Sequence, residues 1–154
     1  MAGDFLQICY VTNDFEQAIA KLRNVHSIGP FKEMRDHRVP TREDRAAVGH
    51  FALAFKADTQ FEIIEPVSED VGIYRDFLSG QGFQMRFHHL GRHIASLTEY
   101  REALQQAKSR WPVPIDMAGF GGYYAYLDAR EEFGHYLELL CFPAASVATD
   151  VPRY

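Results

Sequence analysis

The sequence predicts an α+β protein made of two βαβββ modules that pack on each other. The same order of strand and helix patterns occurs twice along the chain, and each predicted helix carries one apolar stripe. Such a helix covers one face of a sheet and leaves the other face open, so neither copy closes a core alone. With 154 residues, 47% of them hydrophobic, the chain can bury one shared core but is too short for two independent domains.

The first module is predicted over residues 5–65. Its opening segment, FLQICYVT, is β-branched and aromatic, which is typical of a strand. A helix is predicted to follow with Asn13 as its N-cap, because Glu16 lies three residues later. The apolar stripe of this helix comprises Phe15, Ala18, Ile19 and Leu22. Three further strands, PFKEMRDHRV, GHFALAFKA and QFEIIEP, are separated by the turn-rich segments PTREDR and ADT.

A linker helix is predicted over residues 66–83, because Ile73, Tyr74, Phe77 and Leu78 have helical spacing before a glycine stop. The second module, residues 84–142, then repeats the first. It comprises the strand FQMRFHHLGRHI, a helix capped by Ser96 with Glu99, and the strands VPIDMAGF, YYAYLDA and HYLELLCF. We expect the tail, residues 143–154, to be a surface extension and assign it no role.

Composition and charge exclude several classes of function. Sixteen basic against twenty-one acidic residues give a net charge of −5, which disfavours nucleic acid as a partner. No apolar run reaches the length of a membrane span, and the N-terminus has no leader pattern, so we expect a soluble cytoplasmic protein. Cys9 and Cys141 lie in apolar stretches near opposite ends, and we expect both to be reduced.

Polar side chains interrupt the first and last strands of both modules. Alternation places Gln7 on one face of its strand, with Cys9 and Val11. The opposite face, with Leu6, Ile8 and Tyr10, is predicted to meet the covering helix. Glu62 and Glu138 each interrupt an apolar last strand.

The strand that opens the second module carries two adjacent histidines. Alternation predicts that His89 shares a face with Phe87 and Gly91, and that His88 lies on the opposite face with Leu90. Each module thus offers one polar donor at its start and one at its end. Oxygen and nitrogen donors without a thiolate suit a divalent cation such as zinc, nickel, cobalt, iron or manganese, and they disfavour a structural zinc site.

The segments QICYVTNDFEQAI, FEIIEP, FHHLG and GHYLELL occur in the order and topology of a known superfamily. Over residues 5–142 the chain resembles the vicinal oxygen chelate superfamily of glyoxalase I, methylmalonyl-CoA epimerase, extradiol dioxygenases and bleomycin-resistance proteins. The resemblance implies a glyoxalase-like fold, in which two modules form one half-open barrel cleft, and a homodimer. It implies metal ligands at Gln7, Glu62, His89 and Glu138, a set that looks like that of glyoxalase I. His93 is the rival for the histidine position.

The resemblance implies a metal-dependent isomerase or lyase of the glyoxalase type. Such an enzyme binds a small oxygen-chelating substrate and forms an enolate or enediolate, with Glu138 and Glu62 as the catalytic proton carriers. A CoA-thioester epimerase is the close alternative, and a metal-free small-molecule binding protein of the bleomycin-resistance type is the alternative from another class. An extradiol dioxygenase is disfavoured, because Gln7 stands where a histidine of its triad would be.

Other polar features have simpler interpretations. We expect His88 and His93 to be structural or surface residues, and His135 to face away from the cleft. The arginines of residues 35–45 are interpreted as part of a solvated loop, with an anion clamp as the alternative. The stretch GFGG, residues 119–122, precedes no predicted helix, so a hairpin turn is expected there and not a phosphate loop.

Overall fold

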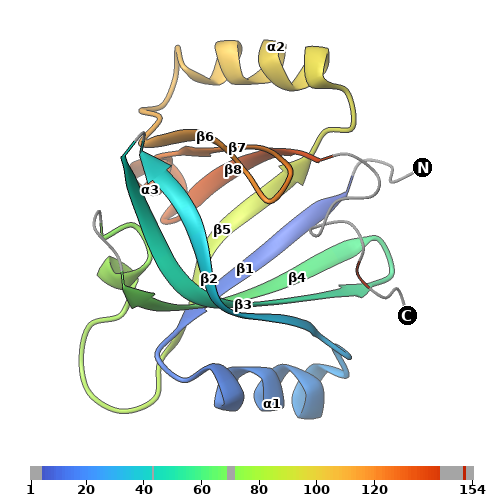
Figure 1. Cartoon of the computed structure of the whole chain (residues 1–154), viewed down its shortest axis with the longest axis vertical. Coiled ribbons are helices and arrows are strands. Elements are labelled where there is room, and N and C mark those ends of the chain that lie inside the picture. Colours follow the sequence, from blue (N-terminus) through green and yellow to red (C-terminus); the bar gives the residue numbers. More distant parts are fainter. Residues whose placement is uncertain (1–4, 43, 69–71, 143–150, 152–154) are drawn as a thin grey trace.

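The computed structural model describes residues 5–42, 44–68, 72–142 and 151. Their strands form one curved sheet in the order β2-β3-β4-β1-β5-β8-β7-β6. The edge strands β2 and β6 contact each other, so the sheet is nearly closed into a barrel (Figure 1). The elements are β1 (Leu6–Thr12), α1 (Phe15–His26), β2 (Lys32–Arg42), β3 (Arg45–Lys56), β4 (Thr59–Ser68), η1 (Arg75–Phe77), β5 (Met85–His93), α2 (Leu97–Ala107), β6 (Ile115–Gly119), β7 (Gly122–Leu127), α3 (Arg130–Phe133) and β8 (Tyr136–Cys141).

The two halves have the same topology, as the sequence predicted. In each half the first strand pairs in parallel with the last, β1 with β4 and β5 with β8. The halves meet where β1 pairs antiparallel with β5. Helices α1 and α2 lie outside the barrel, at opposite ends of the view in Figure 1. The predicted α+β class with two βαβββ modules is therefore confirmed, and the short helix α3 is an addition that the sequence pattern did not indicate.

Three large apolar clusters hold these layers together. The predicted stripe of α1 is buried against β3 and β4, and Tyr100, Leu104 and Ala107 of α2 are buried against β7 and β8. The third cluster fills the barrel interior with aromatic and aliphatic side chains from both modules. Neither module encloses this third cluster alone, which is why the two must fold together. Within the described residues, no helix combines the length and apolarity needed to cross a membrane.

The helix caps agree with the sequence at α2 and differ by one residue at α1. Ser96 caps α2, where its hydroxyl accepts a hydrogen bond from the backbone N–H of Glu99. At α1 the cap is Asp14, whose carboxylate accepts from the backbone N–H of Gln17, and not Asn13 as predicted. The Asn13 side chain instead donates to the carbonyl of Gly82 and accepts from the backbone N–H of Gln84. Asn13 therefore ties the first module to the second.

Removal of the Ser96 hydroxyl is expected to destabilise the protein modestly. Ser96→Ala leaves an N–H of the first turn of α2 without its acceptor, so the free energy of unfolding should fall by about 1 kcal/mol. Urea denaturation measures this change. Thr98→Ala is the matched control, because Thr98 is exposed and lies within the helix, where alanine is the better helix former. Equal losses in both variants would contradict the cap.

The linker between the modules is shorter in its helical part than predicted. Residues 69–71 of the expected 66–83 helix lie outside the described residues, and the helix present is the three-residue 3-10 turn η1. Ile73 and Tyr74 are nevertheless buried, and Phe77 and Leu78 pack against the same barrel cluster. Helical spacing therefore marked the inward side chains correctly, although a compact turn buries them without an α-helix.

A β-bulge in β5 overturns the predicted facing of its histidines. Cys9 pairs with His89 and the next residue, Tyr10, pairs with Phe87, so His88 is the extra residue. Both imidazoles consequently point into the barrel and are completely buried, whereas Phe87 lies outside with 37% of its surface exposed. Strict alternation was wrong here, because a bulge shifts the side-chain parity by one residue.

Two further expectations about surfaces need correction. The outer face of β1 is only partly covered by α1, since Leu6 is 50% exposed. Most of the tail, residues 143–150 and 152–154, lies outside the described residues. Val151 is described, and it is buried against Phe5, Leu53 and Phe55. At that position the chain packs against the barrel instead of extending over the surface.

Candidate metal centre

Strand pairing brings the four predicted site residues together inside the barrel. Gln7 of β1 lies opposite Gly91 of β5, and Gly91 lies opposite Glu138 of β8. Two residues along, Cys9 lies between Glu62 of β4 and His89 of β5. Glu62 thus lies opposite Cys9, two residues after Gln7. In the same way Glu138 lies opposite Gly91, two residues after His89. The two modules therefore contribute equivalent pairs, Gln7 with Glu62 and His89 with Glu138.

The imidazole of His89 is the centre of this group. Its Nε2 atom lies 3.0 Å from Gln7 Oε1, 3.0 Å from Glu138 Oε2 and 3.4 Å from Glu62 Oε2. All four residues are buried, with Glu62 the most exposed at 9%. Three oxygen atoms and one nitrogen atom, from four strands, therefore converge in the barrel interior.

Each of these four side chains has a buried partner that orients it. The Gln7 amide donates from Nε2 to Gln60 Oε1 at 2.8 Å, which turns its own Oε1 toward His89. The other three pairs are Glu62 with the Cys9 thiol, His89 with His88, and Glu138 with the Tyr126 hydroxyl. Tyr126 is in turn 3.2 Å from the Tyr74 hydroxyl. Ligands of metal sites are commonly held by such partners.

The charges of the group are strongly coupled. Burial lowers the pKa of His89, but the charges and hydrogen bonds of Glu138 and Glu62 outweigh burial and raise its pKa to about 9. Burial raises the pKa of Glu138, an effect that His89 partly offsets. Burial, followed by the charge of Glu62, raises the pKa of the Cys9 thiol, which favours the neutral form. Without an ion, the imidazolium of His89 therefore provides the positive charge between two carboxylates.

The distances from His89 Nε2 to the three oxygens are compatible with a shared divalent ion. Two atoms that are each about 2.1 Å from one ion lie about 3.0 Å apart at a right angle and about 3.4 Å apart at a tetrahedral angle. The spacing of the three oxygens from His89 Nε2 falls within this range. A divalent ion with a neutral imidazole would also balance both buried carboxylates, which is the usual requirement for burying such charges.

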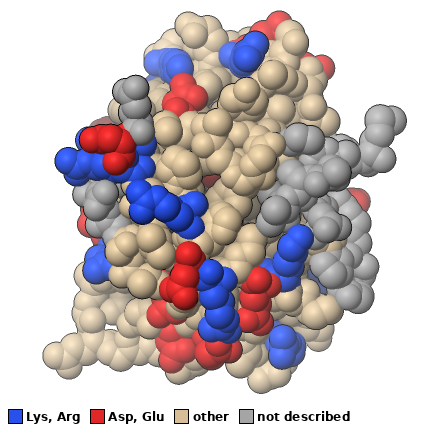
Figure 2. All heavy atoms as spheres, viewed as in Figure 1, with Lys and Arg blue, Asp and Glu red and all other residues tan. Residues whose placement is uncertain are grey.

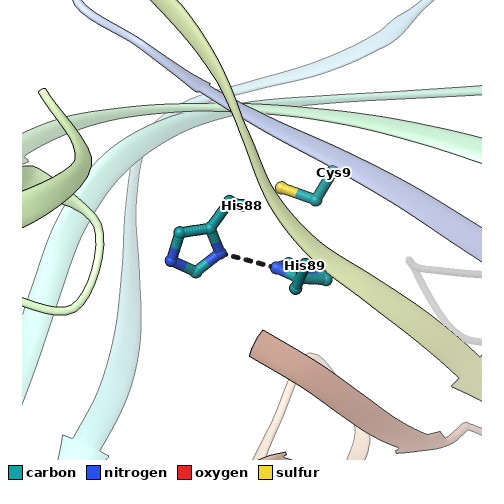
Figure 3. Close-up of side chains that lie close together, drawn as sticks. All are labelled: Cys9, His88 and His89. Carbon is teal, nitrogen blue, oxygen red and sulfur yellow. Dashed lines mark hydrogen bonds between the residues drawn. The ribbon is translucent and has the colours of Figure 1, made fainter. Parts of the chain in front are cut away.

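A second set of donors shares His89. Cys9, His88 and His89 are completely buried, and their ligand atoms lie within 4.8 Å of one another, so this cluster could also hold a metal (Figure 3). Its two Nδ1 atoms are already hydrogen-bonded to each other at 2.8 Å. The first set of donors lies on the other side of the His89 ring. It differs from the Cys9 cluster because Gln7, Glu62 and Glu138 line a pocket.

That pocket occupies the barrel interior and is mostly apolar. It is small, with about 30 Å³ of space for water-sized molecules, and it is partly open to solvent. Gln7, Glu62 and Glu138 are its acidic and amide groups, and Tyr74, Tyr124 and Tyr126 add hydroxyls. The remaining lining is Met34, Val39, Phe51, Leu53, Ile64, Phe120, Leu140 and Phe142. Few polar groups in an apolar concavity are typical of a small-molecule site.

Gly91 provides the space that Gln7 occupies. A Cβ atom at Gly91 would lie 2.9 Å from Gln7 Oε1 and 3.0 Å from Gln7 Cβ. Gly91→Ala is therefore expected to displace the amide and to weaken divalent-ion binding by about tenfold or more, as losses of orienting contacts do. Isothermal titration with zinc measures the affinity.

A double-mutant cycle isolates this contact. In a Gln7→Ala background the amide is gone and only the contact with the Cβ atom of residue 7 remains, so Gly91→Ala should reduce the remaining zinc affinity less than it does in the wild-type protein. Additive losses in the double variant would show that the glycine acts through something other than Gln7.

The other histidines and the arginines lie apart from this group. His93 is buried, but its Nε2 bonds the backbone of Phe142 and its ring stacks on Phe5, so it does not join the other four residues. His135 packs against Phe87 on the outside of β5. Arg35 pairs with Glu16 and Glu33 and covers the Phe15 ring. Arg38, Arg42 and Arg45 are exposed, and the described lining of the pocket includes no arginine.

Sequence reasoning missed the partner residues. Gln60 and Cys9 could have been found, because each shares strand parity with a candidate ligand, Gln60 with Glu62 and Cys9 with Gln7. Tyr126 required knowledge that β7 pairs with β8, which sets it opposite Glu138. His88 required the bulge. The GFGG stretch forms the expected hairpin turn between β6 and β7.

The molecular face in Figure 2 shows basic and acidic side chains interspersed around a largely uncharged centre. The figure shows no extended surface of one sign on this face. This distribution is consistent with the small net negative charge, and the described residues of this face form no continuous basic track of the kind that binds a phosphate backbone.

No family model matches the sequence, and no curated protein matches it. Solved structures do match. A hypothetical protein from Bacillus halodurans C-125 is 16% identical with a TM-score of 0.62, over 89% of this chain and 93% of that one. A Streptomyces coelicolor methylmalonyl-CoA epimerase variant in complex with 2-nitronate-propionyl-CoA is 15% identical with a TM-score of 0.60, over 91% and 97%.

The methylmalonyl-CoA epimerase from Mycobacterium tuberculosis is similar to the same extent. It is 15% identical with a TM-score of 0.59, over 91% of this chain and 87% of that one. Two of these three structures are therefore methylmalonyl-CoA epimerases, and the third is a hypothetical protein. The chain therefore has the glyoxalase-like fold, which it shares with these epimerases.

Proposed function

We propose that this protein is a divalent-metal-dependent epimerase or isomerase that moves a proton on the carbon next to the carbonyl of an acyl thioester. One observation carries the proposal: two buried carboxylates, Glu62 and Glu138, flank one imidazole nitrogen and both line the pocket. Epimerisation needs a base to remove a proton and an acid to return one on the other face of the same carbon. Two carboxylates at one pocket meet that need.

The residues that would hold the ion are Gln7 through Oε1, His89 through Nε2, Glu62 and Glu138. A divalent ion bound there supplies positive charge where an enolate oxygen develops. Glu138 is the better candidate to accept the proton, because burial raises its pKa above the ordinary value of a glutamate and so makes it a stronger base. The Tyr126 hydroxyl bonds Glu138 and holds its orientation. Glu62, which is slightly more exposed, would return the proton.

The substrate class is supported by the neighbours. One epimerase with a TM-score of 0.59 is in complex with methylmalonyl-CoA and NH4+, and it covers 95% of this chain. The Streptomyces coelicolor variant holds a propionyl-CoA analogue. These ligands favour a thioester over the substrate of a glyoxalase-type lyase. The apolar pocket lining suits a short acyl group.

A glyoxalase-type lyase is the second candidate. One glutamine, two glutamates and one histidine meet inside the barrel. This set looks like the ligand set of glyoxalase I. The same carboxylates would move a proton between the two carbons of an enediolate. The two functions differ in substrate and not in the groups that transfer the proton.

Solvent isotope exchange separates these candidates. Reconstituted protein in deuterium oxide is incubated with a panel of acyl-CoA thioesters and, separately, with 2-oxoaldehydes and thiols. Exchange at the α-carbon of a thioester supports the epimerase, and conversion of an oxoaldehyde adduct supports the lyase. Glu62→Gln should reduce either rate by about 100-fold or more, whereas Glu102→Gln on the exposed side of α2 should not change it.

Failure of every substrate with every metal, together with tight retention of a small hydrophobic molecule, would favour the metal-free binding protein. The homodimer that the resemblance implied stays a prediction, which elution volume on a sizing column tests.

A further inference from the structure

The bulge in β5 places two histidines side by side in the barrel wall. His88 and His89 are completely buried, and their Nδ1 atoms are 2.8 Å apart (Figure 3). On its other side, His88 Nε2 lies 2.9 Å from the backbone carbonyl of Ile73, just before η1. His89 Nε2 points to Gln7, Glu62 and Glu138. A single chain of contacts therefore runs from the linker through both rings to the candidate metal centre.

Hydrogen-bond chemistry sets the direction of this chain. A carbonyl oxygen only accepts, so the proton between His88 and Ile73 belongs to His88 Nε2. A second proton on His88 would bury a positive charge among the rings of Tyr74, Phe77, Tyr126 and Tyr136, where it is costly. His88 Nδ1 therefore accepts, and His89 Nδ1 donates its proton to it.

The proton on Nδ1 of His89 determines the state of Nε2, the nitrogen on the other side of the ring. With Nδ1 protonated, the neutral ring carries its lone pair on Nε2, the atom that faces the three oxygens. The opposite tautomer would point an N–H toward any ion held by those oxygens. His88 and the Ile73 carbonyl thus select the only neutral form of His89 that can act as a ligand in this pocket.

We propose that His88 is a positioning residue, which holds the ring of His89 and its Nδ1 proton so that Nε2 is offered to the divalent ion. This role rests on the proposed metal-dependent function. The positioning role also gives the bulge in β5 a function, because without the extra residue the His88 side chain would lie outside the barrel. Bulges are known to re-aim side chains beside functional sites.

The test compares two substitutions of His88 by titration with zinc. His88→Phe keeps a ring but removes the acceptor, and we expect zinc to bind about 10-fold to 100-fold more weakly, as for the loss of other ligand-orienting groups. His88→Gln retains an acceptor and a donor on one side chain and should restore most of the affinity. Thermal unfolding of the metal-free variants reports any general loss of packing.

Nitrogen-15 NMR of the histidine rings supplies a readout that packing alone does not move. The zinc-loaded wild-type protein should show His89 protonated at Nδ1 and bound through Nε2, and His88 protonated at Nε2. Zinc on Nδ1 of His89, or equal affinity of wild type and His88→Phe, would overturn the positioning role. A wild-type protein that binds no zinc would instead contradict the proposed function.

Cobalt substitution tests the alternative cluster of Cys9, His88 and His89. Ligation by Cys9 would give a sulfur-to-cobalt charge-transfer band that disappears in Cys9→Ala, and this result would also overturn the proposal. Cobalt binding without that band, retained in Cys9→Ala, supports it.

Discussion

Glu138→Ala is expected to remove the divalent ion almost completely from a protein that otherwise carries it near stoichiometrically. Glu138 Oε2 is one of the two closest oxygens to His89 Nε2, and its carboxylate is buried. Loss of a direct ligand should weaken binding by more than the 10-fold to 100-fold cost of losing an orienting partner, so by more than about 100-fold. Elemental analysis after gel filtration measures the ion content.

Two companion variants make this result specific. Glu138→Gln keeps the shape of the side chain and one oxygen donor but removes its charge, so it should retain more ion than alanine while losing the proton acceptor. Glu102→Gln removes a carboxylate from the exposed surface of α2 and should keep full ion content. A wild-type protein that stays metal-free after incubation with nickel, cobalt, zinc and manganese would redirect the assignment to a binding protein.

Lowering the pH from 9 to 6 is expected to weaken divalent-ion binding by about a thousandfold. In the metal-free protein, burial lowers the pKa of His89, but Glu138 and Glu62 outweigh burial and raise its pKa to about 9. Below that pH an ion must displace the proton on His89, and affinity falls about tenfold for each pH unit. Zinc titration calorimetry in buffers of different ionisation heat measures both the affinity and the released proton.

The stability of the metal-free protein should change in the opposite direction. Because the pKa of His89 lies above its ordinary value of 6.5, its protonated form stabilises the fold fully below pH 6.5, and this contribution is lost as the pH rises through 9. Thermal unfolding of the metal-free protein should therefore occur at lower temperature at pH 9 than at pH 6.5. A His89→Gln variant should lack this pH dependence, and an unchanged profile would show that His89 is not protonated.

The sequence alone predicted the repeated architecture and the four candidate ligands. Amphipathic stripes identified the buried faces of both helices, because a helix covers a sheet only through one apolar side. Gln7, Glu62, His89 and Glu138 were predicted because each is a polar residue on the first or last strand of a module, and because the superfamily that the chain resembles has its metal ligands at these positions. These features depend on residue type and on the spacing of apolar residues along one segment, and both can be read from the sequence without knowing which strands pair.

Only the tertiary structure decided how these residues meet. The parallel pairing within each module and the antiparallel pairing of β1 with β5 join residues far apart in the chain, and no local period encodes them. The bulge that turns His88 inward is a property of the pair β1 and β5, because an extra residue is defined only against its partner strand. The hydrogen-bonded partners of the four central side chains depend on that same pairing, so strand register converts a set of polar residues into a site.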